Sequence, residues 1–166
     1  MARRTAPMGH RARTALFVAV FVLLLAVDQA VKAWARAALD PAAVVTLVPH
    51  VLGLTLVQNG GAAFGMMQGA TILLVVCAVA VTAGCCVALR RFEPANPAEV
   101  IALGMISSGG VGNAIDRVSQ GSVTDMLTFL FMHFPVFNVA DVALTCGFVI
   151  LVATMFALAR REGVES

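Results

Sequence analysis

Long apolar runs alternate with short polar segments along the chain. The apolar runs cover about residues 14–37, 70–89, 98–115 and 139–159. Each run is long enough to cross roughly 30 Å of hydrocarbon as a helix. The pattern predicts a membrane all-α protein with four transmembrane helices, folded as a single domain over residues 1–166.

The loop between the first two apolar runs has a different periodicity. Leu52, Leu54 and Leu56 alternate with smaller or more polar residues, and such alternation indicates a β-strand. The turn-forming dipeptide Asn59-Gly60 follows, so we expect a small hairpin-like β element outside the membrane. Asn59 is then either a turn residue or a site residue.

The loop between the last two apolar runs is rich in aromatic residues. Phe129, Phe131, Phe134 and Phe137 lie within a few positions of one another. This density is typical of a segment that lies in the lipid interface, and we expect an interfacial helical segment here. The same side chains would also serve as core, and the two interpretations are compatible.

The third apolar run is poor in large residues and contains a serine and glycine stretch from Ser107 to Gly112. Small residues let helices approach closely in lipid. The glycines do not form a dinucleotide-binding fingerprint, because Ile115 stands where its last glycine should be.

Composition and charge place the chain in a membrane and orient it there. Hydrophobic residues make up 60% of the chain and charged residues 12%, with a mean hydropathy of +0.94, whereas soluble domains average about 25% charged residues. Eight of the eleven Lys and Arg residues form three clusters: Arg3, Arg4, Arg11 and Arg13; Arg90 and Arg91; Arg160 and Arg161. Such clusters mark the cytoplasmic side, so both termini are expected there. They lack interleaved aromatic residues and indicate no nucleic-acid partner.

This topology places the two long loops, about residues 38–69 and 116–138, outside the cytoplasm. It also gathers polar residues at the outer boundary: Asp28, Lys32, Asn59, Asp116, Arg117, Asp125, Asn138 and Asp141.

The first apolar run also has features of a cleavable signal peptide, since a basic start precedes it and the small-residue pattern of Ala35 and Ala37 follows it. Asp28 and Lys32 argue against removal. They separate the apolar run from the cleavage pattern and form an i, i+4 acid–base pair on a helix. We therefore expect this segment to be retained as the first transmembrane helix.

Cysteine and histidine positions indicate no metal site. The four cysteines lie within apolar runs and are interpreted as small packing residues. The three histidines are scattered singly, without the spacing of metal ligands. We expect neither a metal nor another cofactor.

Asp125 and Asp141 are the candidate catalytic residues. A carboxylate at the depth of a membrane helix costs roughly 2.5 to 3.5 kcal/mol, so such residues usually line a hydrated functional site. Asp125 follows a Gly/Ser turn and Asp141 opens the last apolar run, so both can lie at one membrane boundary. Two carboxylates that approach closely do not both ionise easily, and one can then act as a base and the other as an acid.

Structural roles compete with this interpretation. Asp141 is also suited to be an acid at a helix N-terminus with Asn138 as its cap. Asp116 and Arg117 are equally suited to be an ion pair at the end of the third helix. Among functions, a proton-coupled transporter would place its acids near mid-membrane, and an assembly subunit would use its small-residue helices for packing alone.

Five blocks of the sequence resemble the bacterial lipoprotein signal peptidases, the family also called signal peptidase II. The blocks are VDQAVK with Asp28 and Lys32, QNGGAAFG with Asn59 and Gly60, GGVGNAIDR with Gly112, Asn113, Asp116 and Arg117, SVTDML with Asp125, and FNVAD with Asn138, Ala140 and Asp141. They follow one another in the family's order between Thr14 and Arg160.

The resemblance implies a membrane aspartyl endopeptidase at the outer face of the bacterial cytoplasmic (inner) membrane. Such an enzyme removes signal peptides from prolipoproteins, cutting amino-terminal to a cysteine that carries a diacylglyceryl group. Asp125 and Asp141 would be the catalytic pair. The other residues of the blocks would bind substrate or support the site, namely Asp28, Lys32, Asn59, Gly60, Gly112, Asn113, Asp116, Arg117, Asn138 and Ala140.

The resemblance also implies an extracytoplasmic sheet cradle formed by the first loop. Prolipoproteins and membrane lipid would be the partners and globomycin-type cyclic peptides the inhibitors, and we expect a monomer. Three positions depart from the family. Gln58 stands where Arg is usual, Gly60 replaces a commoner Thr, and Met126 stands where an aromatic residue usually follows the catalytic Asp. These departures affect local substrate contacts and leave both aspartates in place.

Overall fold

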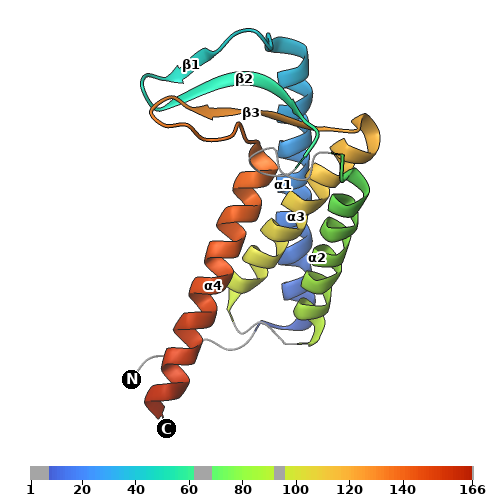
Figure 1. Cartoon of the computed structure of the whole chain (residues 1–166). Helices are drawn as coiled ribbons and strands as arrows, with labels where there is room; N and C mark the ends of the chain where they lie inside the picture. Colours follow the sequence, from blue (N-terminus) through green and yellow to red (C-terminus); the bar gives the residue numbers. More distant parts are fainter. Residues whose placement is uncertain (1–7, 62–68, 92–95, 166) are drawn as a thin grey trace.

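In the part of the chain that the structure describes, four helices form a bundle, and a three-stranded sheet covers one end of it (Figure 1). The computed structural model describes residues 8–61, 69–91 and 96–165. The elements are α1 (His10–Ala38), β1 (Val45–Val48), β2 (Leu52–Asn59), α2 (Thr71–Arg91), α3 (Pro97–Gln120), β3 (Val123–Phe129) and α4 (Val139–Glu165). All four helices are long and apolar enough to cross a membrane, which confirms the predicted membrane helices.

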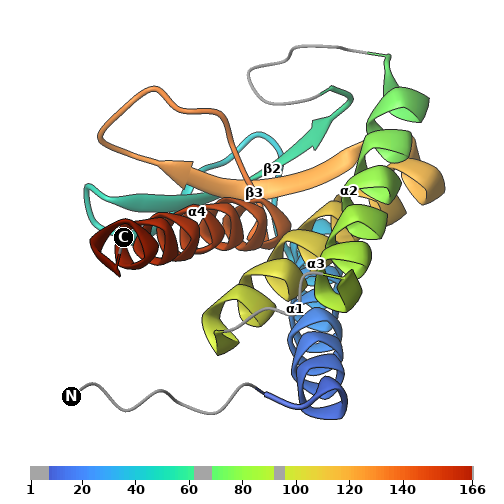
Figure 2. The same ribbon diagram turned by 90° about the horizontal axis from the view of Figure 1, so that it is seen from below.

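Helix α3 lies at the centre of the bundle and contacts the other three helices, as the view along the bundle shows (Figure 2). Its small residues make this possible. A Cβ atom added at Gly109 would collide with the carbonyl oxygen of Ala140 and would lie 3.1 Å from the Cβ atom of Leu144. The serine and glycine stretch therefore lets α4 pack directly on the α3 backbone.

The ends of α3 follow from its sequence. Asn96 caps the start, because its side chain accepts a 2.9 Å hydrogen bond from the backbone N–H of Ala98. Gly121 ends the helix with a positive φ of 77°, and its N–H donates to the carbonyl of Arg117 at 3.1 Å. The helix is thus longer than the apolar run predicts, and Asp116 and Arg117 lie within it instead of in the following loop.

Strands β1 and β2 form an antiparallel hairpin. The turn lies between them at residues 49–51, where His50 has a φ of 60°. Asn59 is the last residue of β2, so the interpretation of Asn59-Gly60 as the hairpin turn is wrong. Residues 62–65 of the QNGGAAFG block lie outside the described residues.

The third strand comes from the second long loop. Strand β3 pairs antiparallel with β2, in a register that sets Val57 opposite Asp125 and Asn59 opposite Val123. The chain then turns back, and Phe137 pairs with Leu127 on the other side of β3. The predicted interfacial helical segment is therefore a strand followed by a non-helical loop at residues 130–138.

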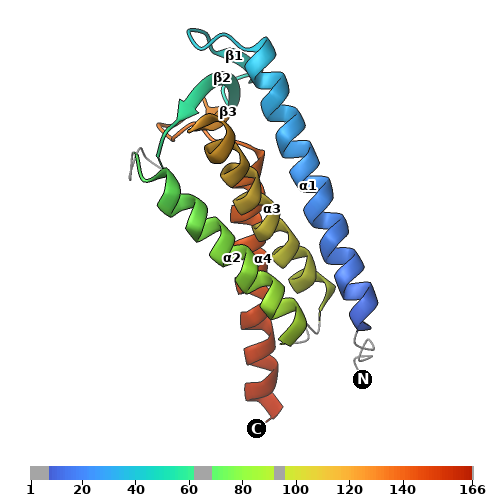
Figure 3. The same ribbon diagram turned by 90° about the vertical axis from the view of Figure 1, so that its right-hand side faces the viewer.

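The sheet lies at one end of the bundle, and the ends of α1, α2 and α4 that carry clustered basic residues lie at the other (Figure 3). Helix α1 begins next to Arg11, α2 ends with Arg90 and Arg91, and Arg160 lies in the last turns of α4. All three of these helix ends point away from the sheet. Because basic clusters mark the cytoplasmic side, this separation would place the sheet outside the cytoplasm, and the orientation stays a prediction.

Candidate active site

Asp125 lies in the middle of β3 with only 2% of its surface exposed. The pairing of β2 with β3 brings the end of β2 beside it. As a result, the side-chain Nδ2 of Asn59 donates to the Oδ2 atom of Asp125 at 3.0 Å. Asn59 is thus a site residue whose place is set by the strand register.

Asp141 lies in the first turn of α4, and Asn138 caps that helix. The N–H of Asp141 donates to the Oδ1 atom of Asn138 at 2.9 Å, and the N–H of Asn138 donates to the Oδ2 atom of Asp141 at 3.2 Å. This reciprocal pair of bonds is a capping box. The capping role suggested for the two residues is therefore real, and it fixes the direction in which Asp141 points.

Asn138 also connects the two aspartates. Its Nδ2 donates to the Oδ1 atom of Asp125 at 2.6 Å, while its backbone N–H bonds to Asp141. Asn138 has no exposed surface, so this bridge is rigid. The loop that returns along β3 thus brings together two acids that lie 16 positions apart in the sequence.

Asn113 approaches Asp141 from α3. Its Nδ2 donates to the Oδ1 atom of Asp141 at 2.7 Å, and its Oδ1 accepts from the Nζ of Lys32 at 2.8 Å and from the Nδ2 of Asn138 at 3.0 Å. With Asn59, three amides surround the two aspartates. Each of the four carboxylate oxygens accepts a hydrogen bond from one of these asparagines.

A buried ionic cluster lies behind the three amides. The Nζ of Lys32 is 3.0 Å from the Oδ2 of Asp28 and 3.4 Å from the Oδ2 of Asp116, and all three side chains are buried. Removing one partner of such a cluster leaves an uncompensated buried charge, which typically costs about 3 to 5 kcal/mol. The cluster therefore locks α1 to α3.

The same cluster positions the neighbouring backbone. The Oδ1 of Asp28 accepts from the N–H of Ala140 at 2.9 Å, which ties α1 to the start of α4. The Oδ2 of Asp116 accepts from the N–H of Thr124 at 3.0 Å, next to Asp125. The VDQAVK and GGVGNAIDR blocks thus hold the two segments that carry the aspartates.

A cavity of about 440 Å³ opens beside the two aspartates. Polar and charged side chains line one part of it, and apolar side chains line the rest. Its lining includes Asn59, Arg117, Asp125, Phe129, Phe134, Phe137, Asp141, Val142, Thr145 and Cys146. Because Thr145 and Cys146 lie one turn further along α4, the cavity extends from the sheet down the side of a membrane-spanning helix.

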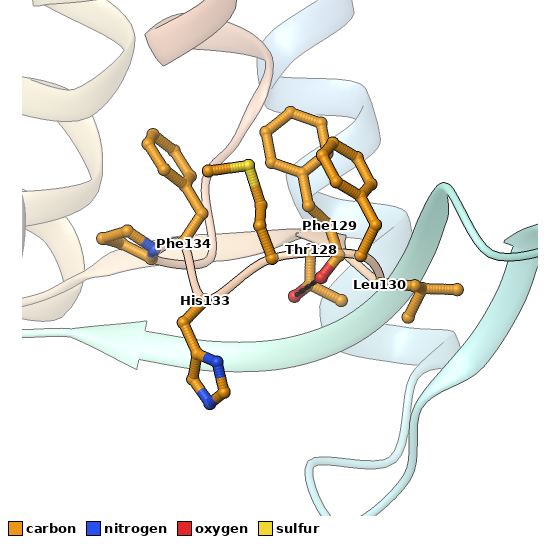
Figure 4. Close-up of a pocket in the computed structure, with 8 residues that line it drawn as sticks. Thr128, Phe129, Leu130, His133 and Phe134 are labelled. Carbon is orange, nitrogen blue, oxygen red and sulfur yellow. Dashed lines mark hydrogen bonds between the residues drawn. The ribbon is translucent and has the colours of Figure 1, made fainter.

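The loop after β3 forms one wall of this cavity and encloses a second, more open hollow, shown in Figure 4. The ring of Phe129 lies 5.1 to 5.6 Å from the rings of Phe131, Phe134 and Phe137, measured between centroids. His133 points away from this aromatic group. Packing around Phe129 therefore shapes the loop without any helix.

The environment of Asp125 suits proton exchange. Burial raises the pKa of this carboxyl to about 6, the hydrogen bond from Asn59 opposes the rise, and the nearby charge of Asp141 adds to it. An acid tuned toward neutral pH by burial beside a second acid is typical of catalytic carboxyl pairs.

The remaining predicted site residues lie around the two aspartates, and they differ in how closely their side chains contact other groups. The Nη2 of Arg117 donates to the carbonyl oxygen of Gly61 at 2.8 Å, and its Nη1 donates to that of Asn113 at 3.4 Å. Gly112 packs against Asp28, and Ala140 is buried beside it. Gly60 is exposed at the end of β2, with nothing within 4 Å of an added Cβ atom.

Sequence reasoning missed three polar residues near the site. Gln29 donates its Nε2 to Asp28, to the carbonyl of Gly112 and to Asp116. Arg36 donates to the hydroxyl of the buried Thr124 at 3.0 Å. Helical spacing gave one available signal, since Arg36 lies four positions after Lys32.

The cysteines differ in their surroundings, which only partly fits their interpretation as packing residues. Cys85 is buried, whereas Cys77 and Cys146 are exposed, and Cys146 lines the cavity. Within the described part of the chain, no group of three or more His, Cys, Asp and Glu side chains is arranged to hold a metal ion.

Solved structures share this fold. One bacterial membrane enzyme superposes with a TM-score of 0.81 at 24% identity, covering 85% of this chain and 87% of the other. A second bacterial membrane enzyme gives a TM-score of 0.77 at 25% identity, covering 84% and 91% of the two chains. The chain is therefore a multi-pass membrane protein with the architecture of a known class of bacterial membrane enzymes.

The family follows from sequence similarity. The model of the signal peptidase (SPase) II family matches residues 20–157. A lipoprotein signal peptidase of Streptococcus pneumoniae is 37% identical over 143 residues, which is 86% of this chain and 94% of that protein. One of Latilactobacillus sakei is 36% identical over 149 residues, covering 90% and 97%. The chain belongs to the signal peptidase II family, and it is a peptidase.

Proposed function

We propose that the chain is an aspartic endopeptidase that removes the signal peptide from prolipoproteins, with Asp125 and Asp141 as its catalytic pair. The observation that carries this proposal is the bridge through Asn138, which bonds to both carboxyl groups beside one cavity. Family membership and the names of the relatives support the prolipoprotein substrate.

The two carboxyl groups share the chemistry of peptide hydrolysis. One of them, ionised, takes a proton from a water molecule as its oxygen attacks the scissile carbonyl carbon. The other, protonated, donates its proton to the carbonyl oxygen, which gives a neutral tetrahedral diol. The carbon–nitrogen bond then breaks as the first carboxyl group gives its proton to the leaving amine, and the second takes a proton back from a diol hydroxyl as the C=O double bond forms again. The pair ends with one proton, as it began.

The amides and Arg117 have separate roles in this mechanism. The donors from Asn59, Asn113 and Asn138 hold both carboxyl groups in place, which avoids reorganisation during the reaction. Arg117 lines the cavity and can bind backbone carbonyls of an extended substrate.

The position of the cavity supports cleavage at the outer face of the cytoplasmic membrane, with both termini in the cytoplasm. The acids lie where the sheet meets the helix ends, at the opposite end of the bundle from Arg90, Arg91 and Arg160. A proton-coupled transporter would place such acids near mid-membrane, so this geometry favours the peptidase. We expect the cut amino-terminal to the lipid-modified cysteine, and we expect the enzyme to act as a monomer of one domain without a metal.

A cleavage assay tests this function. The purified protein is incubated with a diacylglyceryl-modified prolipoprotein, and mass spectrometry locates the cut. We expect a single cut directly before the modified cysteine, unaffected by metal chelators or serine-directed reagents and blocked by a globomycin-type cyclic peptide. Loss of activity on chelation that zinc restores would instead indicate a metalloprotease.

A further inference from the structure

Three asparagine side chains meet the two aspartates, and each presents its NH₂ group. Asn59 and Asn138 donate to Asp125 at 3.0 and 2.6 Å, and Asn113 donates to Asp141 at 2.7 Å. An asparagine amide has an acceptor on one side and donors on the other. Each amide can therefore be rotated by half a turn, unless a neighbouring group fixes its oxygen.

For two of the three amides the backbone fixes the oxygen. The N–H of Gly61 donates to the Oδ1 of Asn59 at 3.0 Å, and the N–H of Asp141 donates to the Oδ1 of Asn138 at 2.9 Å. A backbone N–H is only a donor, so it cannot face an NH₂ group. The fold itself thus sets these two orientations.

For Asn113 a side chain has this role. Its Oδ1 accepts from the Nζ of Lys32 at 2.8 Å and from the amide of Asn138 at 3.0 Å. An ammonium group has three donors and no acceptor. Lys32 has no exposed surface and is held between Asp28 and Asp116. A rotated Asn113 would press its NH₂ group against this buried cation.

We propose that Lys32 is a positioning residue for the reaction proposed above, acting by holding Asn113 in the orientation that donates to Asp141. The inference rests on that proposed function. Without Lys32 only the amide of Asn138 still donates to this oxygen, so the amide of Asn113 rotates more easily and presents its oxygen to Asp141. A carbonyl oxygen facing a carboxyl group stabilises the protonated acid, whereas an N–H stabilises the ionised one.

The charged groups that surround Asn113 come from four elements. They are Asp28 and Lys32 on α1, Asp116 and Arg117 on α3, Asp125 on β3 and Asp141 on α4. Removing Lys32 alone would leave two acids buried without their cation, and the protein would be destabilised for that reason. The test must therefore change the cluster without adding unpaired charge.

The double variant Lys32→Met/Asp28→Asn comes closest to this requirement, because it removes one positive and one negative charge together and leaves Asp116 bonded to Gln29 and to the N–H of Thr124. Its matched control is Asp28→Asn, which keeps the ammonium group facing Asn113. We expect the double variant to lose kcat on the order of 10²-fold relative to this control, since misplaced catalytic groups have effects of that size. We expect KM to change little and both limbs of the pH–rate profile to move to higher pH.

Thermal unfolding of both variants separates folding from positioning. Equal pH–rate profiles for the double variant and Asp28→Asn, at comparable unfolding temperatures, would overturn the proposal.

A second variant decides the matter if the double variant does not fold. Asn113→Asp keeps an oxygen against Lys32 and gains an ion pair with it, but it replaces the NH₂ group that faces Asp141 with an oxygen. We expect a folded protein with lower kcat and a pH–rate profile displaced to higher pH. An unchanged profile would overturn the proposal. Failure of the wild type to cut any prolipoprotein would instead contradict the proposed function, so the two failures are distinguishable.

Discussion

Gly112 of α3 lies directly against Asp28 of α1: a Cβ atom added at Gly112 would lie 2.6 Å from the Oδ2 atom of the aspartate. The same carboxylate pairs with Lys32 and accepts from the N–H of Ala140. The missing side chain at Gly112 thus leaves room for the buried acid that joins α1, α3 and α4.

We expect Gly112→Ala to lower the free energy of unfolding by about 1 to 3 kcal/mol, because overpacking a filled site costs that much. Activity should fall with it, since the shifted Asp28 carries both Lys32 and the start of α4. Gly84→Ala on α2 is the matched control, as nothing lies within 4 Å of a Cβ atom there. Unfolding in detergent followed by circular dichroism measures both. Equal free energies of unfolding for the two variants would contradict this prediction, because they would show that the helices around Gly112 accommodate a Cβ atom without cost.

The pH dependence should report the shared proton of the aspartate pair. Burial raises the pKa of Asp125 to about 6, so the carboxyl is protonated below this pH and ionised above it. We expect kcat/KM to fall as the pH rises through about 6, because the pair then loses the proton that the carbonyl oxygen needs. A rate that stays constant from acid to alkaline pH would contradict this.

Asn59→Ala should move that fall to higher pH. The amide of Asn59 donates to Asp125 and so lowers its pKa, and its removal lets the pKa rise further. Gln58→Ala is the control, because the Gln58 side chain bonds to Ser122 and Thr124 and not to either aspartate. If Gln58→Ala displaced the pH profile and Asn59→Ala did not, the effect would come from a disturbed sheet and not from the loss of the Asn59 amide.

The substrate should require its lipid as well as its sequence. The cavity lies where β3 meets the N-terminal end of α4, so the scissile bond must be held at that depth in the membrane. Each buried CH₂ group contributes about 0.8 kcal/mol, and two acyl chains therefore anchor the cleavage site firmly. We expect a prolipoprotein with serine in place of the modified cysteine to remain uncut. Comparable initial rates for both substrates in one detergent would indicate an enzyme that reads sequence alone.

The orientation in the membrane can be tested with reporter fusions. Fusions after Arg91 and Arg160 should report the cytoplasm, and a fusion at Gln120 should report the outer side, because the basic helix ends remain inside. A cytoplasmic signal at Gln120 would place the aspartates on the wrong side for a signal peptidase.

Hydrophobic length and charge were sufficient to predict the four helices, because a membrane span needs a long apolar run whatever its neighbours are. The third strand was not predictable in the same way. Residues 123–129 lack a clear alternation of apolar and polar positions, since both faces of β3 are buried near Asp125. Its pairing with β2 depends on two loops that are distant in sequence.

The residues of the site could be predicted from the sequence, but the hydrogen bonds that connect them could not. The family blocks named Asn138 and Asp141, yet only the structure shows one capping box that also reaches Asp125. Amide orientation depends on which donors lie opposite each oxygen, and sequence spacing carries no such information. The roles of Lys32 and Gln29 therefore emerge only from three-dimensional contacts.

Cleavage of a lipid-modified prolipoprotein by Asp125→Asn and Asp141→Asn, measured beside the wild type, tests the catalytic pair most directly. An amide keeps the shape of the carboxyl group but cannot exchange the proton, and general acid–base groups contribute roughly 10² to 10⁴ in rate. Asp40→Asn is the control, since this exposed aspartate only caps a turn through the N–H of Ala42. We predict that each of the two variants inserts and folds but loses cleavage by at least about 10²-fold, while Asp40→Asn cleaves like the wild type. Near-normal turnover by either Asp125→Asn or Asp141→Asn would remove that residue from the catalytic pair.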